Sequence, residues 1–292
     1  MKRLAALFLL GFLALPAPAA PQSMHAHPAL WRVEGDHASV ALFGSVHVLA
    51  PNVDWQTQEV KRAIKAAQVF VFEVPLDTAT IGRVSALMSE RGSLPPGQSL
   101  RQMLPPDSRA DLDKAVAATQ LPEAAVDNKR PWLVSLMLVS AHLQQHQQQF
   151  ALGADSVVLE QATKAKKPIR YLETADQQLA LIAPSDPKVE LQSLEEELKS
   201  FATEDADIAA ITGAWEKGDT AALDALSSKE FVGQPEARAT FFTERNRNWV
   251  KQIEAMLRER KTFFITVGAG HLVGKDGVPA LLRADGYKVQ GP

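Results

Sequence analysis

Two apolar, β-rich runs, one near each end of the chain, finish in the same Gly-x-x-His pattern. The first, SVALFGSVH, places His47 shortly after Gly44, and the second, TFFITVGAGH, places His271 shortly after Gly268. Glycine allows a ligand to approach the backbone closely and permits positive φ angles. We therefore expect both histidines to follow the ends of strands, with the two glycines forming backbone turns.

Strand and helix patterns alternate in both terminal regions of the chain. The runs LWRV and SVALFG flank Gly35 and Asp36 and predict a hairpin. A helix over 54–68 with Asp54 as its N-cap and a buried strand over 69–74 should follow. The C-terminal region predicts a helix over 239–260, a strand over 262–268, a helix over 278–286 and a strand over 287–290. Strands joined by such helices run parallel.

The middle of the chain has helical patterns, with one strand-like run at 167–173. We therefore expect an α/β fold in which the N- and C-terminal βαβ elements form one mixed sheet. A large central helical insertion or cap over about 80–239 should belong to the same single domain, 29–292. The acidic run between Ala175 and Lys199 is interpreted as a solvated helix face.

The first residues have the pattern of a secretory signal peptide. Lys2 and Arg3 precede an apolar stretch that is too short to cross a membrane, and small residues follow up to Ala19. We expect cleavage after Ala19, a flexible tail over 20–28, and an exported protein, periplasmic or extracellular, without stable membrane insertion. Loss of the two cations changes the net charge from −3 to −5, which argues against nucleic acid as a partner.

A third chemical group is expected beside the two histidines. Glu73 finishes the apolar run VFVFE, where a buried carboxylate needs a partner or a ligand. The carboxyl ends of parallel strands lie at the rim where open α/β sheets bind ligands. His47, Glu73 and His271 should therefore form a site suited to a divalent metal ion or to water activation. Because the chain has no cysteine, a metal site must use His, Asp or Glu.

Several segments, in a fixed order, carry a family resemblance. They are HPALWRVEGDHASVALFGSVHVL, VFVFEV, YLETADQQLALI, ERNRNWVKQIEAML and FFITVGAGHLVGKDGVPALLRADGYKV. Together they resemble the TraB/GumN family, the bacterial relatives of the Tiki metalloproteases. By match with the family pattern, the resemblance implies a site made of His47, Glu73, Arg245 and His271. Ser45 stands where the family usually has threonine.

The resemblance implies a divalent-metal-dependent peptidase or a related hydrolase acting on a peptide or small-molecule substrate. In the metal version, His47, Glu73 and His271 hold manganese, cobalt or zinc, and Arg245 stabilises the oxyanion. In a metal-free version, which the similar erythromycin esterases suggest, His47 is a general base oriented by Glu73. A non-catalytic haem- or small-ligand-binding protein is a further alternative, although the chain offers only two tyrosines as haem ligands.

Two other features of the sequence are candidate components of a site. His142 and His146 have the spacing of a zinc-binding helix, but HLQQH lacks the glutamate of the H-E-x-x-H motif. A packing role is therefore predicted for both. Glu173, in the segment LET, either anchors the central helices or faces the cleft, and the sequence does not separate these possibilities.

Overall fold

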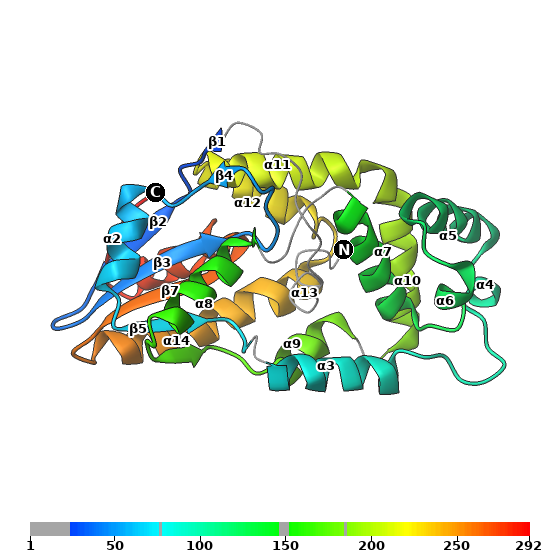
Figure 1. The fold of residues 1–292 in the computed structure, drawn as a ribbon, viewed down its shortest axis with the longest axis horizontal. Helices are drawn as coiled ribbons and strands as arrows, with labels where there is room; N and C mark the ends of the chain where they lie inside the picture. The colour runs from blue at the N-terminus through cyan, green and yellow to red at the C-terminus, as the bar shows by residue number, and fades with distance from the viewer. Residues whose placement is uncertain (1–23, 76–77, 146–151, 184–185) are drawn as a thin grey trace. The chain divides into compact units, whose positions relative to one another are not determined.

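The structure is a computed structural model that describes residues 24–75, 78–145, 152–183 and 186–292 (Figure 1). The predicted signal peptide over 1–19 and His146 lie outside these residues. The described chain forms two compact units, a helical unit (75, 78–145, 174–183 and 186–207) and a sheet unit (24–74, 152–173 and 208–292). In these ranges no helix is long and apolar enough to span a bilayer.

A six-stranded mixed sheet with the order β6-β5-β7-β3-β2-β8 forms the centre of the sheet unit. Its strands are β2 Leu30–Glu34, β3 Ser39–Ser45, β5 Val69–Phe72, β6 Ile169–Tyr171, β7 Thr262–Gly268 and β8 Lys288–Gln290. Strands β6, β5, β7 and β3 run parallel, whereas β2 is antiparallel to β3 and β8. The predicted α/β class is confirmed. The two ends of the chain form one mixed sheet as predicted, since β3 and β7 are neighbours in it (Figure 1).

The strand sequences explain this arrangement. The hairpin predicted around Gly35 and Asp36 is present as β2 and β3. All residues of β5 are buried, as expected for a strand with partners on both edges and cover on both faces. The strands β3 and β5 are parallel as predicted, but β7 lies between them.

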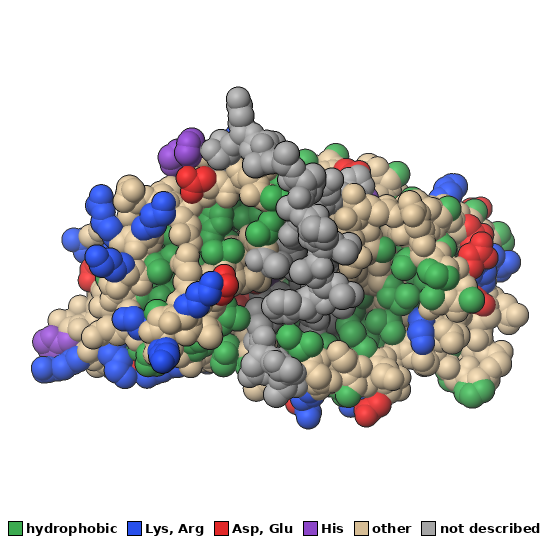
Figure 2. Space-filling model, in the orientation of Figure 1, with side chains coloured by type: hydrophobic (Ala, Val, Ile, Leu, Met, Phe, Trp, Pro, Cys, Tyr) green, Lys and Arg blue, Asp and Glu red, His purple; other side chains and the backbone are tan. Residues whose placement is uncertain are grey.

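Helices and short turns surround the sheet. They are α2 Gln58–Ala66, α8 Ala154–Lys164, α12 Thr220–Lys229, α13 Pro235–Arg238, the π-helical η3 Ala239–Thr243, α14 Glu244–Leu257, the 3-10 turn η4 Ala269–Leu272 and α15 Val278–Ala284. Helix α2 is amphipathic: Val60 and Ala63 are buried, while the cations on its outer face are visible in Figure 2. Its N-cap is Thr57, which accepts from Val60 N at 3.2 Å, and not the predicted Asp54, which lies in a strand.

The beginning of the described chain differs from the flexible tail expected over 20–28. Strand β1 Met24–His25 pairs in parallel with β4 Val53–Asp54. Ala26 is buried, and the backbone N–H of His27 donates to the carbonyl of Glu216. From Met24 onward the chain is therefore part of the fold, and residues 20–23 lie outside the described ranges.

The helical unit contains α3 Thr78–Arg91, α4 Leu100–Met103, α5 Pro106–Thr119, α6 Glu123–Val126, α7 Pro131–Gln145, α9 Ala175–Ile182, α10 Pro187–Ser200, the 3-10 turn η2 Phe201–Thr203 and the start of α11 Glu204–Glu216. Leucine and valine side chains of α5, α7 and α10 form its main core. The acidic run is not wholly solvated as expected, because Glu190 and Glu197 are buried, and Arg130 pairs with Glu190. His142 is buried against Phe201 and bonded to Asp205, in agreement with a packing role.

Candidate functional site

The carboxyl ends of the parallel strands meet around Gly268. Ser45, the last residue of β3, is opposite Gly268, the last residue of β7, and Phe72 at the end of β5 is opposite Thr266. A Cβ built on Gly268 would lie 3.4 Å from Glu73 Oε1, 3.7 Å from His271 Cδ2 and 3.8 Å from His47 Nε2. The structure therefore brings together the three residues that the sequence placed at strand ends.

Arg245, on α14, links these groups. Its Nη2 donates to Glu73 Oε2 at 2.8 Å and its Nη1 approaches His271 Nε2 at 3.0 Å. The remaining N–H groups donate to both carboxylate oxygens of Glu173 and to the carbonyl of Phe241. Every N–H of the guanidinium thus has an acceptor, so an oxyanion could reach it only if one of these bonds broke. Arg245 is better placed to fix Glu73 and His271 than to fill the oxyanion role that the resemblance implied.

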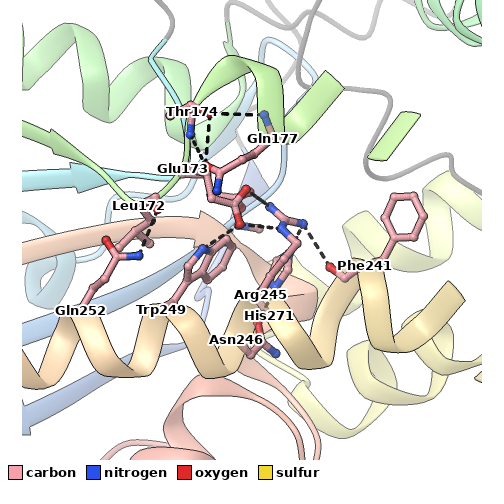
Figure 3. Close-up of polar contacts among 12 residues, drawn as sticks. Leu172, Glu173, Thr174, Gln177, Phe241, Arg245, Asn246, Trp249, Gln252 and His271 are labelled. Carbon is pink, nitrogen blue, oxygen red and sulfur yellow. Dashed lines mark hydrogen bonds and ion pairs between the residues drawn. The ribbon is translucent and has the colours of Figure 1, made fainter. Parts of the chain in front are cut away.

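Glu173 belongs to this site. It follows strand β6, and its backbone N–H donates to the carbonyl of Glu73 at 2.7 Å. Its carboxylate also accepts from Trp249 Nε1 at 2.8 Å, and Figure 3 shows it facing Arg245 and Trp249 of α14. Of the two possibilities left open by the sequence, the structure supports the one in which Glu173 faces the site.

The side chain of His47 is bonded to a residue of helix α8. Its Nδ1 lies 3.1 Å from Oδ2 of Asp155 on α8, and both side chains are buried. An ionised carboxylate can only accept hydrogen bonds, so this contact places the proton on Nδ1. Nε2 then carries the lone pair and points to the space beside Gly268.

His271 has the same tautomer with a neutral partner. Its Nδ1 lies 2.6 Å from Oδ1 of Asn246, and Asn246 Nδ2 donates to the carbonyl of Asp276 at 2.8 Å, which fixes the orientation of the amide. Nδ1 of His271 must therefore donate, and Nε2 accepts from Arg245. The ring also packs against Phe242 and Trp249 at centroid distances of 4.7 Å and 4.3 Å.

The two histidines differ in their electrostatics. Burial lowers the pKa of His47, but the charges of Asp155 and then Glu73 raise it by more, so its pKa lies above the ordinary value. Burial, followed by the charge of Arg245, holds the pKa of His271 well below the ordinary value. Burial also raises the pKa of Glu73 against the opposing charges of Arg245 and His47. His47 is therefore the imidazole that can gain a proton, and His271 stays neutral.

In a comparison with models of protein families, residues 29–291 match one family. This range includes nearly all of the described chain. The chain belongs to the TraB/PrgY/gumN family. The resemblance seen in the sequence is thereby confirmed for this TraB/PrgY/gumN protein.

The relatives of this TraB/PrgY/gumN protein include the metalloprotease TIKI1 of Danio rerio, which is 26% identical over 89% of the chain. Metalloprotease TIKI1 of Homo sapiens is 25% identical over 92% of the chain. The chain spans 62% and 63% of the lengths of these two relatives. No solved structure matches it.

The relatives are named metalloproteases. The geometry of the TraB/PrgY/gumN site shows whether its residues, as placed, could hold a metal ion. Two imidazoles and a carboxylate are suitable ligands for manganese, cobalt or zinc, and each imidazole has its Nδ1 held by an oxygen. However, Arg245 occupies His271 Nε2 and Glu73 Oε2. Within the described ranges, no three His, Asp or Glu side chains are placed to hold a metal ion. As placed, the residues do not fit one, and the metal site at His47, Glu73 and His271 stays a prediction.

The glycines of the two Gly-x-x-His motifs, Gly44 and Gly268, do not adopt the positive φ angles that glycine permits. A Cβ on Gly44 would lie 3.0 Å from Cα of Ala269, so this glycine lets β3 pack against the chain that leads to His271. Gly268 ends β7 and caps the turn η4, as expected of a backbone turn, whereas Gly44 lies within β3 and forms no turn.

Sequence reasoning did not identify Asp155 or Asn246 as site residues and left the role of Glu173 open. Glu173 had a usable signal, since it follows a strand just as Glu73 does. Asp155 offered no such signal: an acidic residue in the first turn of a helix is ordinary for helix stability. Its contact with His47 joins positions that are far apart in the chain.

Proposed function

We propose that this member of the TraB/PrgY/gumN family is a hydrolase of the peptidase type that activates water beside Gly268. The observation that carries the proposal is the convergence of His47 Nε2, Glu73 and His271 around a residue without a side chain. The missing Cβ leaves the reacting groups exposed to one another at the rim of the sheet. The name of the relatives, metalloprotease, supports the same reaction class.

In the proposed mechanism His47 is the general base. Its Nε2 takes a proton from water, and the resulting hydroxide adds to the carbonyl carbon of the substrate. The bond between this carbon and the leaving group then breaks, and the leaving group takes the proton from Nε2. The imidazolium that forms is stabilised by the neighbouring carboxylates of Asp155 and Glu73. Arg245 holds Glu73 and His271 in position. The mechanism requires no covalent intermediate.

A divalent metal ion is the second candidate: His47, Glu73 and His271 would hold it, and it would supply the activation of water. The name of the relatives is the observation that favours it. This version requires Arg245 to release Glu73 and His271, because it occupies both in the structure. It also predicts that metal binding and activity are lost together.

The test is hydrolysis of a fluorogenic peptide library and of labelled casein by the protein that starts at Ala20. We expect turnover that survives EDTA and is lost in His47→Ala. Loss of turnover in EDTA, restored by manganese, cobalt or zinc, would support the metal version instead. The control is His142→Ala, which removes a buried, aspartate-bonded histidine of the helical unit and should retain turnover. If the parent cleaves neither substrate with or without these metals, the proposed function is wrong.

We propose in addition that the protein acts after export, in the periplasm or outside the cell, on a peptide or small molecule. The N-terminal pattern of Lys2, Arg3 and an apolar stretch up to Ala19 supports export. The acidic net charge supports a substrate other than nucleic acid.

A further inference from the structure

We infer that Asp155 is a positioning residue that fixes the Nδ1–H tautomer of His47, and that this tautomer directs the lone pair of Nε2 at the reaction site. The tautomer follows from the contact of Nδ1 with a carboxylate oxygen, because an ionised carboxylate can only accept a hydrogen bond. Its effect on the reaction rate rests on the proposed function, in which His47 is the base. Asp155 is a positioning residue because it acts through the imidazole and does not contact the proposed water.

The segment that carries Asp155 is fitted closely to the segment that carries His47. The backbone N–H of Ala154 donates to the carbonyl of Val46 at 3.0 Å. A Cβ on Gly153 would overlap the carbonyl oxygen of His47, so only glycine permits this approach of the start of α8. The backbone thus sets the position of Asp155 Oδ2, 3.1 Å from His47 Nδ1.

The negative charge of Asp155 acts on the imidazole of His47. Its side chain is 11% exposed, and its Oδ1 has no hydrogen-bond partner in the part of the chain that the structure describes. A buried carboxylate is costly without compensation, and the imidazole is its ion-pair partner in these ranges. A carboxylate behind an imidazole favours one tautomer and stabilises the imidazolium that forms during proton transfer.

His271 differs from His47 in that the partner of its Nδ1, Asn246, is neutral. Asn246 sets the tautomer of His271 as firmly as Asp155 sets that of His47, because its amide is fixed by the carbonyl of Asp276. Asn246 supplies no charge, however, and Nε2 of His271 already faces the guanidinium of Arg245. The two Gly-x-x-His motifs therefore have different roles: His47 receives the proton, and His271 holds Arg245 as a neutral acceptor.

The test reads the tautomer directly. The full mature chain is labelled with ¹⁵N-histidine, and two-bond ¹H–¹⁵N couplings are recorded at alkaline pH, with His47 assigned by a His47→Gln variant. We expect the Nδ1–H form at His47 in the parent. In Asp155→Asn the Nε2–H form should gain population, because the amide can donate to Nδ1. With labelled casein, kcat should fall by roughly 10²-fold to 10⁴-fold while KM is unchanged.

The matched control is Asp205→Asn. It removes the carboxylate from His142, another buried histidine that lies 2.8 Å from an aspartate oxygen, in the helical unit. This variant should leave the tautomer of His47, kcat and KM as in the parent. It separates loss of the carboxylate on His47 from loss of an aspartate–histidine contact elsewhere in the chain.

Three outcomes would overturn the inference. The first is an Nε2–H tautomer at His47 in the parent, which needs no variant to fold. The second is an Asp155→Asn protein in which the tautomer and kcat are both those of the parent. The third is a fall in kcat with an unchanged tautomer, which would assign Asp155 a merely structural role. If the parent shows the Nδ1–H form and Asp155→Asn shifts it, but no hydrolysis is found, the proposed function fails while the positioning by Asp155 stands.

Discussion

Nη2 of Arg245 donates to Oε2 of Glu73 over 2.8 Å, and this single contact joins helix α14 to the end of strand β5. Both side chains are largely buried, at 11% and 1% exposure. A charge at the end of an apolar strand is thereby compensated by a cation from the far end of the sequence. The same guanidinium contacts His271 and Glu173. A substitution of Glu73 should therefore also alter the contacts of these two residues.

The first prediction concerns Glu73→Gln, which keeps the side-chain volume and removes the charge. Hydrolysis should fall by on the order of 10²-fold or more, since the site loses the carboxylate beside His47. The free energy of unfolding should fall by less than the ~3–5 kcal/mol typical of a broken buried pair, because Glu173 still pairs with Arg245. Turnover of labelled casein and urea unfolding measure the two effects.

The control for this substitution is Glu259→Gln. Glu259 pairs with Arg170 in the same unit, but the two side chains are 32% and 38% exposed. The stability change should stay within about 1 kcal/mol, and turnover should equal that of the parent. A Glu73→Gln protein with parental turnover would contradict the proposed site.

The second prediction concerns Gly268→Ala. The φ of Gly268 is −52°, which alanine accepts, and its new Cβ would make ordinary contacts of 3.4–3.8 Å with Glu73, His271 and His47. The protein should fold with a parental melting temperature but lose turnover, because a methyl group then fills the space between the reacting groups.

Gly213→Ala is the matched control, since a Cβ on Gly213, within α11, would meet no atom within 4 Å. It should raise the free energy of unfolding by roughly 0.5–1 kcal/mol and leave turnover unchanged. Parental turnover in Gly268→Ala would show that the chemistry takes place elsewhere.

The third prediction is acid destabilisation through His271. Because its pKa in the folded protein lies well below 6.5, the unfolded chain binds the proton first as the pH falls. Its contribution to stability is therefore present above pH 6.5 and is lost below it, by up to about 1.4 kcal/mol per pH unit. Urea unfolding of the parent and of His271→Gln between neutral and mildly acidic pH measures this slope. Equal slopes in the two proteins would refute it.

The fourth prediction is the pH dependence of turnover. The pKa of His47 is raised above 6.5, and a general base must be unprotonated. The value of kcat/KM should therefore decline as the pH falls through a midpoint above 6.5. The same raised pKa gives a stability contribution that is fully present below 6.5 and is lost as the pH rises through the folded value. A midpoint below 6.5 would exclude His47 as the base.

The fifth prediction concerns the exported form. Cleavage after Ala19 removes an apolar stretch with two cations and leaves a chain that begins at Ala20. Intact-mass measurement of the protein recovered outside the cytoplasm should give the mass of residues 20–292. Recovery of the chain with Met1–Ala19 in a membrane fraction would contradict the prediction.

The sequence by itself determined the sheet and three members of the site. Apolar runs and helical spacing are local patterns, and parallel strands that end at or beside Glu73, Gly44 and Gly268 must bring their ends to one rim. The resemblance then supplied Arg245. Features that depend on small energies or on distant neighbours were predicted wrongly, among them the cap at Thr57 in place of Asp54 and the tail, which forms strand β1 from Met24 onward.

Only the tertiary structure decided which side chains contact one another in the site. Three sets of contacts join positions far apart in the sequence: Asp155 with His47, Asn246 with His271, and Arg245 with Glu73, Glu173 and His271. No local pattern encodes such contacts, because a carboxylate in the first turn of a helix or an asparagine on a helix face satisfies ordinary local rules. The different roles of the two histidines follow from burial and charge at the assembled site, which exist only once the chain has folded.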